Sequence, residues 1–158
     1  MMKVKAARML AASTAVAAVS MSAQAQLSTT LSSPASKDQP YQATITVADT
    51  GKPVDGRKVV AYHLVLSSKT CHSDLSGTAS FFSKTDSGGD DSAFLPNGYA
   101  TKINMFKGSD GNGQVELVMD IESKHPRLVD FTLTGAPATP GGCVPKDGIG
   151  IEFYGASK

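Results

Sequence analysis

The chain has 158 residues, with 15 Lys and Arg, 14 Asp and Glu, a formal net charge of +1 and no Trp. This length suits a single domain with one hydrophobic core. A charge so close to zero, without a basic stripe, excludes the electrostatic footprint of a nucleic-acid-binding protein.

The first 25 residues have the pattern of a secretory signal peptide. Three cationic residues precede an apolar, Ala-rich run, and Ala23-Gln24-Ala25 has the small-x-small form of a cleavage site. The run is too short to span a bilayer, and no second apolar stretch follows that could. We expect cleavage after Ala25, which lowers the formal charge from +1 to −2 by removing three positive charges and no negative ones. The mature protein is then secreted or periplasmic.

The chain has two cysteines, Cys71 and Cys143. Two thiols in one small exported domain usually form a disulfide. Closing a loop of about 70 residues stabilises the fold by about 4 kcal/mol in the chain-entropy model. The alternative is a thiol nucleophile, because His72 and Asp74 stand beside Cys71. Sequence neighbours rarely form a catalytic triad, since the partners must meet in space, and we therefore predict the disulfide.

Strand patterns and turn signals alternate along the rest of the chain. Residues 26–40 are rich in Ser, Thr, Pro and Lys, which predicts a flexible arm whose "LSTTL" could pair as an edge strand. Beyond it, alternation of apolar and polar residues predicts strands. The strand segments are "YQATITVA", "RKVVAYHLVLS", a short "TASFF", "YATKINM" with Tyr99, Ile103 and Met105 alternating, "QVELVMDI", "RLVDFTLTG" and "IGIEFYG".

Seven to eight short strands without an amphipathic helix pattern after the leader predict an all-β fold. We expect an Ig-like antiparallel β-sandwich over residues 41–158, closed by one disulfide. Each strand has one polar face, as antiparallel sheets packed on one side require. The absence of Trp excludes the Trp-on-disulfide core of antibody domains.

Two turn motifs resemble those of bacterial immunoglobulin-like domains of the invasin/intimin type. In "TITVADTGKPVDGRKVVAYHL", a Gly-x-Pro-Val-x-Gly turn separates two strands, and "SDGNGQVELVMDI" has an Asp-x-Asn-Gly turn before a strand rich in Val and Leu. The segment "SGTASFF" is similar to the Gly-Thr segment of the family. The resemblance covers roughly residues 42–121 and implies an Ig-like domain. Family members usually occur as tandem repeats in surface proteins, whereas this chain has a single copy, a cysteine pair and an acidic insertion at Ser83–Gly98.

The Asp-Gly-Asn-Gly run at residues 110–113 could be a calcium loop, a phosphate loop or a turn. With Gly113 at the sixth position of an EF-hand, the first and twelfth positions hold Gly108 and Met119, which cannot supply the required oxygen ligands. A phosphate loop would need Gly-Lys-Ser/Thr before a helix. We interpret Asn112-Gly113 as the positive-φ residues of a tight turn.

No cofactor, metal site or catalytic constellation is predicted. The three His residues, His63, His72 and His125, lack ligand spacing, and His63 is expected to face solvent. No Gly-x-Ser-x-Gly elbow is present. Glu116 and Asp120 share one strand face that is expected to point at solvent, which makes them a poor acid/base pair.

These patterns favour an exported, non-enzymatic binding module of the bacterial envelope or extracellular space. We expect its surface loops to recognise a protein or glycan partner. The predicted binding residues are Asp86, Asp90, Asp91, Phe94 and Leu95 in the Ser83–Gly98 loop, and Tyr99 directly after it. The three acids leave calcium binding open beside a solvated loop. Two alternative functions are a small secreted enzyme or enzyme inhibitor that uses this loop, and a structural subunit that self-associates through sheet edges.

Overall fold

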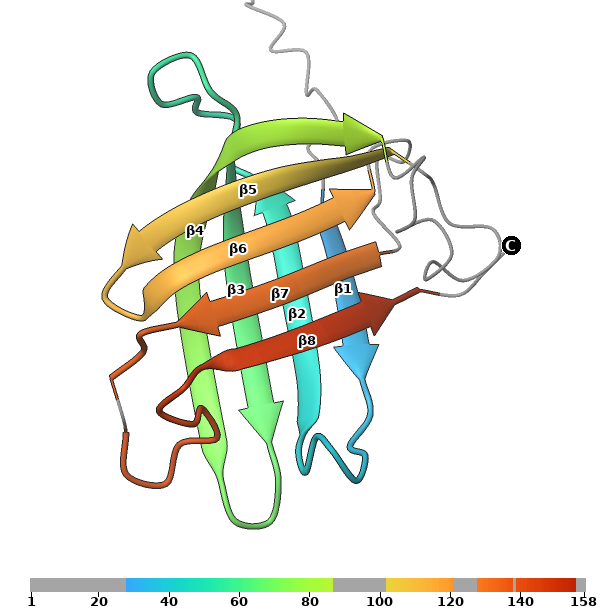
Figure 1. Cartoon of the computed structure of the whole chain (residues 1–158), viewed down its shortest axis with the longest axis vertical. Coiled ribbons are helices and arrows are strands. Elements are labelled where there is room, and N and C mark those ends of the chain that lie inside the picture. The colour runs from blue at the N-terminus through green and yellow to red at the C-terminus, as the bar shows by residue number, and fades with distance from the viewer. Residues whose placement is uncertain (1–27, 87–101, 121–127, 138, 156–158) are drawn as a thin grey trace, which may run out of the picture.

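The computed structural model describes residues 28–86, 102–120, 128–137 and 139–155 (Figure 1). Within these ranges the chain forms eight strands and no helix, so none of the described residues forms a helix that could cross a membrane. The strands are β1 (Ser28–Ser33), β2 (Gln42–Asp49), β3 (Val59–Ser67), β4 (His72–Asp86), β5 (Lys102–Asp110), β6 (Gly113–Asp120), β7 (Leu128–Thr134) and β8 (Ile149–Tyr154). They form one antiparallel sheet in chain order.

The long strand β4 folds this sheet onto itself. Its first part, His72–Ser80, pairs with β3, and its last part, Ser80–Asp86, pairs with β5. The register shifts between Phe81 and Ser83, as is common where a strand turns a corner between two layers. In Figure 1, β1–β4 and β5–β8 form two crossing layers, and β8 returns beside β1. The sheet is therefore nearly closed and barrel-like.

The Ig-like sandwich predicted from the sequence is not confirmed. Two sheets with Greek-key connections require pairing between strands that are distant in sequence. Here each described strand pairs only with its neighbours in the chain. Sandwich and barrel both bury one face of each strand, so period-two alternation could not distinguish them. The all-β class, the antiparallel pairing and the disulfide are confirmed.

The inner face of the sheet is a packed core. On β2, β3, β6, β7 and β8, the alternating apolar side chains predicted to face inward are buried wherever they are described, among them Ile45, Leu64, Leu117, Phe131 and Ile151. Phe106, Phe131 and Phe153 are among the largest fully buried side chains, and the rings of Tyr62 and Phe131 lie 5.4 Å apart. An eight-stranded barrel is just wide enough for side chains to fill it. The observed packing agrees with that size.

Strand β5 is shifted by one residue relative to the predicted alternation. Phe106 is 1% exposed and belongs to the core, whereas Ile103 and Met105 are only half-buried. Tyr99 lies outside the described residues. A one-residue shift exchanges the two faces of a strand. The segment "KINMF" has apolar residues in both phases, so the sequence allowed either assignment.

Two segments expected to be irregular are strands. Ser28–Ser33, in the predicted arm, pairs with β2 along six residues and forms the edge strand named as an alternative. The polar run before "TASFF" is the first half of β4 and pairs with β3. Both segments are rich in Ser and Thr, and their pairing with apolar neighbours decides their conformation.

Candidate functional site

The loop predicted to bind a partner lies largely outside the described residues. Five of its predicted binding residues fall there: Asp90, Asp91, Phe94, Leu95 and Tyr99. Asp86 is the last residue of β4, and its backbone pairs with that of Lys102 at the start of β5. The ends of this loop thus stand on neighbouring strands. Its role in binding stays a prediction.

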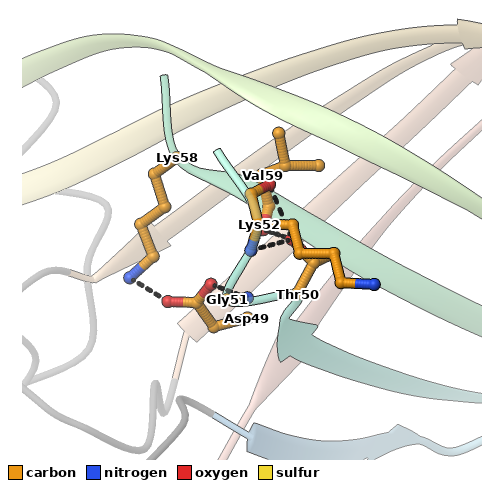
Figure 2. A network of polar contacts seen from close by, with 6 residues as sticks. All are labelled: Asp49, Thr50, Gly51, Lys52, Lys58 and Val59. Atoms are coloured by element: carbon orange, nitrogen blue, oxygen red, sulfur yellow. Dashed lines mark hydrogen bonds and ion pairs between the residues drawn. The ribbon is translucent and has the colours of Figure 1, made fainter. Parts of the chain in front are cut away.

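A second loop, between β2 and β3, is held by a polar network (Figure 2). The carboxylate of Asp49 accepts a hydrogen bond from the backbone N–H of Gly51 at 2.9 Å and lies 3.1 Å from the ammonium of Lys58. The backbone N–H and hydroxyl of Thr50 both donate to the carbonyl of Val59, at 3.1 and 3.0 Å. These contacts join the two ends of the loop and fix where it leaves the sheet.

The electrostatics of this network favour the charged form of Asp49. Burial opposes ionisation of its carboxyl group. The hydrogen bond from Gly51 and the nearby Lys58 ammonium outweigh that effect and lower the pKa of Asp49. The Asp49–Lys58 ion pair is therefore present at neutral pH.

The tip of this loop is a tight turn that presents an apolar side chain. Val54 and Arg57 exchange two backbone hydrogen bonds of 3.0 and 2.9 Å. Between them, Asp55 and Gly56 have φ values of 50° and 72°, and positive φ at both central positions is typical of a type I′ turn. The Val54 side chain is 56% exposed. We call residues 51–58, all of them exposed, the β2–β3 finger.

At another edge of the barrel, the β5–β6 turn holds a buried tyrosine. Tyr62 is 2% exposed, and its hydroxyl donates to Asp110 at 3.0 Å and accepts from the amide of Asn112 at 3.3 Å. The same amide donates to the carbonyl of Ser76 at 2.8 Å. Burial above all raises the pKa of Tyr62 to about 12; the Asn112 hydrogen bond lowers it, while Asp110 raises it. The phenol is thus a neutral donor at physiological pH.

This turn was predicted from the sequence, but the reach of its side chains was not. Gly113 has the expected positive φ, 123°, but Asn112 does not, which corrects half of the prediction; the turn is centred on Gly111 and Asn112. The Asn112 amide reaches a residue of β4 that lies 36 positions earlier in the chain. The tertiary structure therefore shows that Asn112 links the turn to β4 in addition to forming the turn.

A cavity of about 60 Å³ lies beside this cluster, between β4 and the β7–β8 loop. Its lining residues are Ser73, Leu75, Asn112, Ala136, Pro137, Thr139, Gly142 and Val144. Ser73, Asn112 and Thr139 contribute hydroxyl and amide groups to this lining, and Leu75, Ala136, Pro137 and Val144 contribute aliphatic surface. No charged residue is among those that line it.

Covalent and hydrogen bonds fix the loop wall of this cavity. The predicted disulfide between Cys71 and Cys143 is confirmed, with their Cα atoms 5.0 Å apart. The backbone N–H of Cys143 donates to the hydroxyl of Ser73 at 2.8 Å, and that of His72 donates to the carbonyl of Gly141 at 2.9 Å. Both sulfurs are used in the disulfide, so neither is available as the thiol nucleophile considered above.

Two of the remaining candidate catalytic groups, His63 and Asp74, form a pair on the outside of the sheet. His63 lies 2.8 Å from Asp74, and both side chains are about half exposed, as expected for His63. Asp120 corrects a prediction, because it is 4% exposed instead of facing solvent. Its carboxylate accepts a hydrogen bond from the backbone of Leu128 at 3.4 Å, where β7 begins. Within the described ranges, no group of three or more His, Cys, Asp or Glu residues could hold a metal ion.

The outer face of β6–β8 carries three carboxylates. Asp130 and Glu152 are direct register partners, and Glu116 lies on the next strand. Burial first, then the charges of Glu152 and Glu116, raise the pKa of Asp130. Lys107 lies 3.2 Å from Glu116 and offsets part of this charge.

Comparisons of the chain with protein-family models, with curated proteins and with solved structures find no match. The structure therefore places the protein in a class by its architecture alone: an antiparallel, barrel-like all-β protein with one disulfide, a hydrogen-bonded finger and a small cavity.

Proposed function

We propose that the protein is an exported, non-enzymatic binding module of the bacterial envelope or extracellular space that recognises a protein or glycan partner through surface loops. The preorganised β2–β3 finger carries this proposal. A loop already held by its own hydrogen bonds loses little conformational entropy on binding, which favours affinity. The network of Figure 2 is such a constraint.

The composition of the finger supports recognition of an anionic partner. Val54 offers an exposed apolar contact near two cations, Lys52 and Arg57, which outnumber the one acid at the tip, Asp55. Neither cation forms an ion pair within the described part of the chain, whereas Lys58 is engaged by Asp49. Figure 2 shows the Lys52 ammonium pointing away from the network. Charged groups around an apolar anchor favour partners of opposite charge and speed association.

Export is supported by two independent features. The leader pattern of residues 1–25 is that of a signal peptide cleaved after Ala25. The Cys71–Cys143 disulfide is the kind of bond that persists in oxidising compartments. Export of a reporter fused after residue 25, and its loss when the three leader cations are replaced, tests this part of the proposal.

The finger coincides with the Gly-x-Pro-Val-x-Gly turn that resembles domains of the invasin/intimin type. We retain that relationship, and the Ig-like sandwich it implies, as a proposal resting on turn motifs. The sequential strand order lends it no support. A solved structure with two Greek-key sheets would establish it.

The test of function is a crosslinking pull-down with the tagged full chain, expressed and exported by its own host. Lys52→Glu/Arg57→Glu reverses the free charges of the finger, and Lys37→Glu/Lys69→Glu is the matched control at exposed positions elsewhere. We expect a stoichiometric partner that the control retains and the finger variant loses.

A second variant distinguishes the finger from the acidic loop as the site of recognition. Replacing residues 86–95 by a Gly/Ser linker removes most of the predicted acidic site. Loss of the partner with this variant alone would move recognition to the acidic loop. Retention of the partner by both variants would refute recognition through either loop.

A further inference from the structure

The exposed tip of the finger and the cavity beside the disulfide are complementary in size. Val54 is fixed by the turn hydrogen bonds to Arg57, and its three side-chain carbons project into solvent. The cavity has a volume of about 60 Å³. A cavity that holds one water needs about 10–15 Å³, so this cavity has room for several methyl-sized groups.

The two features are also complementary in chemistry. Leu75, Ala136, Pro137 and Val144 give the cavity aliphatic walls that match an isopropyl group. Those walls are held before any partner arrives, on one side by the disulfide and on the other by the contacts of Asn112. A preformed apolar recess of this kind loses little entropy when it is filled.

Charge strengthens the match. Asp110 lies two residues before Asn112, which lines the cavity, and it carries no ion pair with any described Lys, Arg or His. Lys52 and Arg57, on either side of Val54, are the cations of the finger that lack an ion pair in that same part of the chain. Asp55, next to Val54, offsets one of these two charges, so a finger that enters the cavity still brings a net positive charge of one. That charge approaches the Asp110 carboxylate, which accepts hydrogen bonds from Tyr62 and Asn112 but has no described cation within ion-pair distance.

One chain cannot fill its own cavity with its own finger. In Figure 1 the loop between β2 and β3 projects at the upper left, whereas the β7–β8 loop that walls the cavity lies at the lower left. A contact between two different patches of identical chains is heterologous, and it extends into open chains of molecules unless a rotation closes it.

We propose that the protein self-associates head to tail, with Val54 of one copy inserted into the cavity between β4 and the β7–β8 loop of the next. This contact does not depend on the recognition of another partner proposed above, although both use the finger. It differs from association through sheet edges, because side chains carry it and no strand is added.

The test is sedimentation velocity of the purified exported protein, with its disulfide intact, from micromolar to millimolar concentration. The wild type is expected to form dimers and longer species as concentration rises. Val54→Asp removes the apolar tip and Ala136→Leu fills the cavity, and each is expected to weaken association at least ~10-fold, as one lost apolar contact implies. Phe82→Asp is the control, since Phe82 is equally exposed, at 57%, but lies on β4 outside both features.

Mixing the two variants gives the sharpest result. The Ala136→Leu chain keeps an intact finger and the Val54→Asp chain keeps an intact cavity, so the mixture should form one-to-one dimers and nothing longer. Thr139→Phe replaces Ala136→Leu if circular dichroism shows that the latter does not fold. A wild type that stays monomeric, a Val54→Asp chain that associates like the wild type, or a mixture that stays monomeric would overturn the proposal. Failure of the pull-down with an intact sedimentation result would reject only the partner proposed above.

Discussion

Tyr62 on β3 and Gly77 on β4 are direct register partners, and the phenol ring of Tyr62 lies over the glycine. A Cβ atom at Gly77 would stand 2.6 Å from the Tyr62 hydroxyl and would overlap the carboxylate of Asp110. The missing side chain is therefore what allows the hydroxyl to reach the β5–β6 turn. Three strands meet through this one hydrogen-bonded group, next to the proposed cavity.

Gly77→Ala should destabilise the protein by about 2 kcal/mol, because the added methyl group forces Tyr62 or Asp110 out of position. Gly150→Ala is the matched control, since a Cβ there would meet only the Thr132 hydroxyl, at 3.9 Å. Urea unfolding of both variants measures the difference. Equal free energies of unfolding for the two would contradict the steric role of Gly77.

Tyr62→Phe should cost about 1.5 kcal/mol, because it removes a hydrogen bond to a carboxylate and leaves the Asn112 amide with one partner fewer. The raised pKa of Tyr62 also predicts how its contribution to stability changes with pH. The pKa of Tyr62 is raised in the fold from 10.0 to about 12, so the neutral phenol is the stabilised form. Its contribution is complete below pH 10 and is lost as pH rises toward 12.

The measurement is the free energy of unfolding of wild type and Tyr62→Phe at several alkaline pH values. The difference between the two proteins should shrink across that window. Because the other tyrosines are present in both proteins, their titration cancels in the comparison. A difference that stays constant with pH would show that Tyr62 titrates as it does in an unfolded chain.

Asp130→Asn should stabilise the protein at neutral pH by about 0.5 kcal/mol, the usual size of a cross-strand charge effect. Burial, Glu152 and Glu116 raise the pKa of Asp130 above 3.8, so the fold favours its protonated form. Stability is therefore higher below the unfolded pKa and falls as pH rises through the folded pKa. The advantage of Asn should vanish in acid. Thermal melts against pH measure it, with Asp38→Asn, in an exposed loop, as the control.

Removing the disulfide with Cys71→Ser/Cys143→Ser should lower the free energy of unfolding by about 4 kcal/mol, because the unfolded chain regains the freedom of a loop of about 70 residues. The cavity wall should loosen at the same time, since the hydrogen bonds to Ser73 and His72 then tie the β7–β8 loop to β4 without the covalent link. Hydrogen exchange at Gly142 and Cys143 reports this loosening. Unchanged protection there would show that the hydrogen bonds alone hold the loop.

Local patterns in the sequence were enough for the class of fold. The alternation of apolar and polar residues predicts which face of each strand is buried. The structure confirms this for Ile45, Leu64 and Phe131, which are all buried. The two cysteines were enough to predict their own pairing, because the leader pattern predicts an oxidising compartment and two thiols offer one connectivity.

The candidate site could be read only in part. The Gly-x-Pro-Val-x-Gly motif predicts the turn of the finger, but it does not indicate that the Val54 side chain at its tip is exposed for contact. The cavity could not be predicted from the sequence. Its lining residues Leu75 and Val144 are far apart in the chain, and no local sequence pattern indicates that they lie close together. The predicted Ser83–Gly98 site lies mostly beyond the described residues and is neither supported nor contradicted.

The sequence by itself determined most of the strands, the buried faces of five of them, and the disulfide, whereas β1 and the first half of β4 depend on pairing with their neighbours. Tertiary structure decided how the strands close into one sheet, why Phe106 and not Met105 enters the core, and how Asp120 becomes buried. The physical reason is that alternation records burial of a face without recording what covers it. That second piece of information arises only when strand β4 turns the corner and brings distant segments into contact.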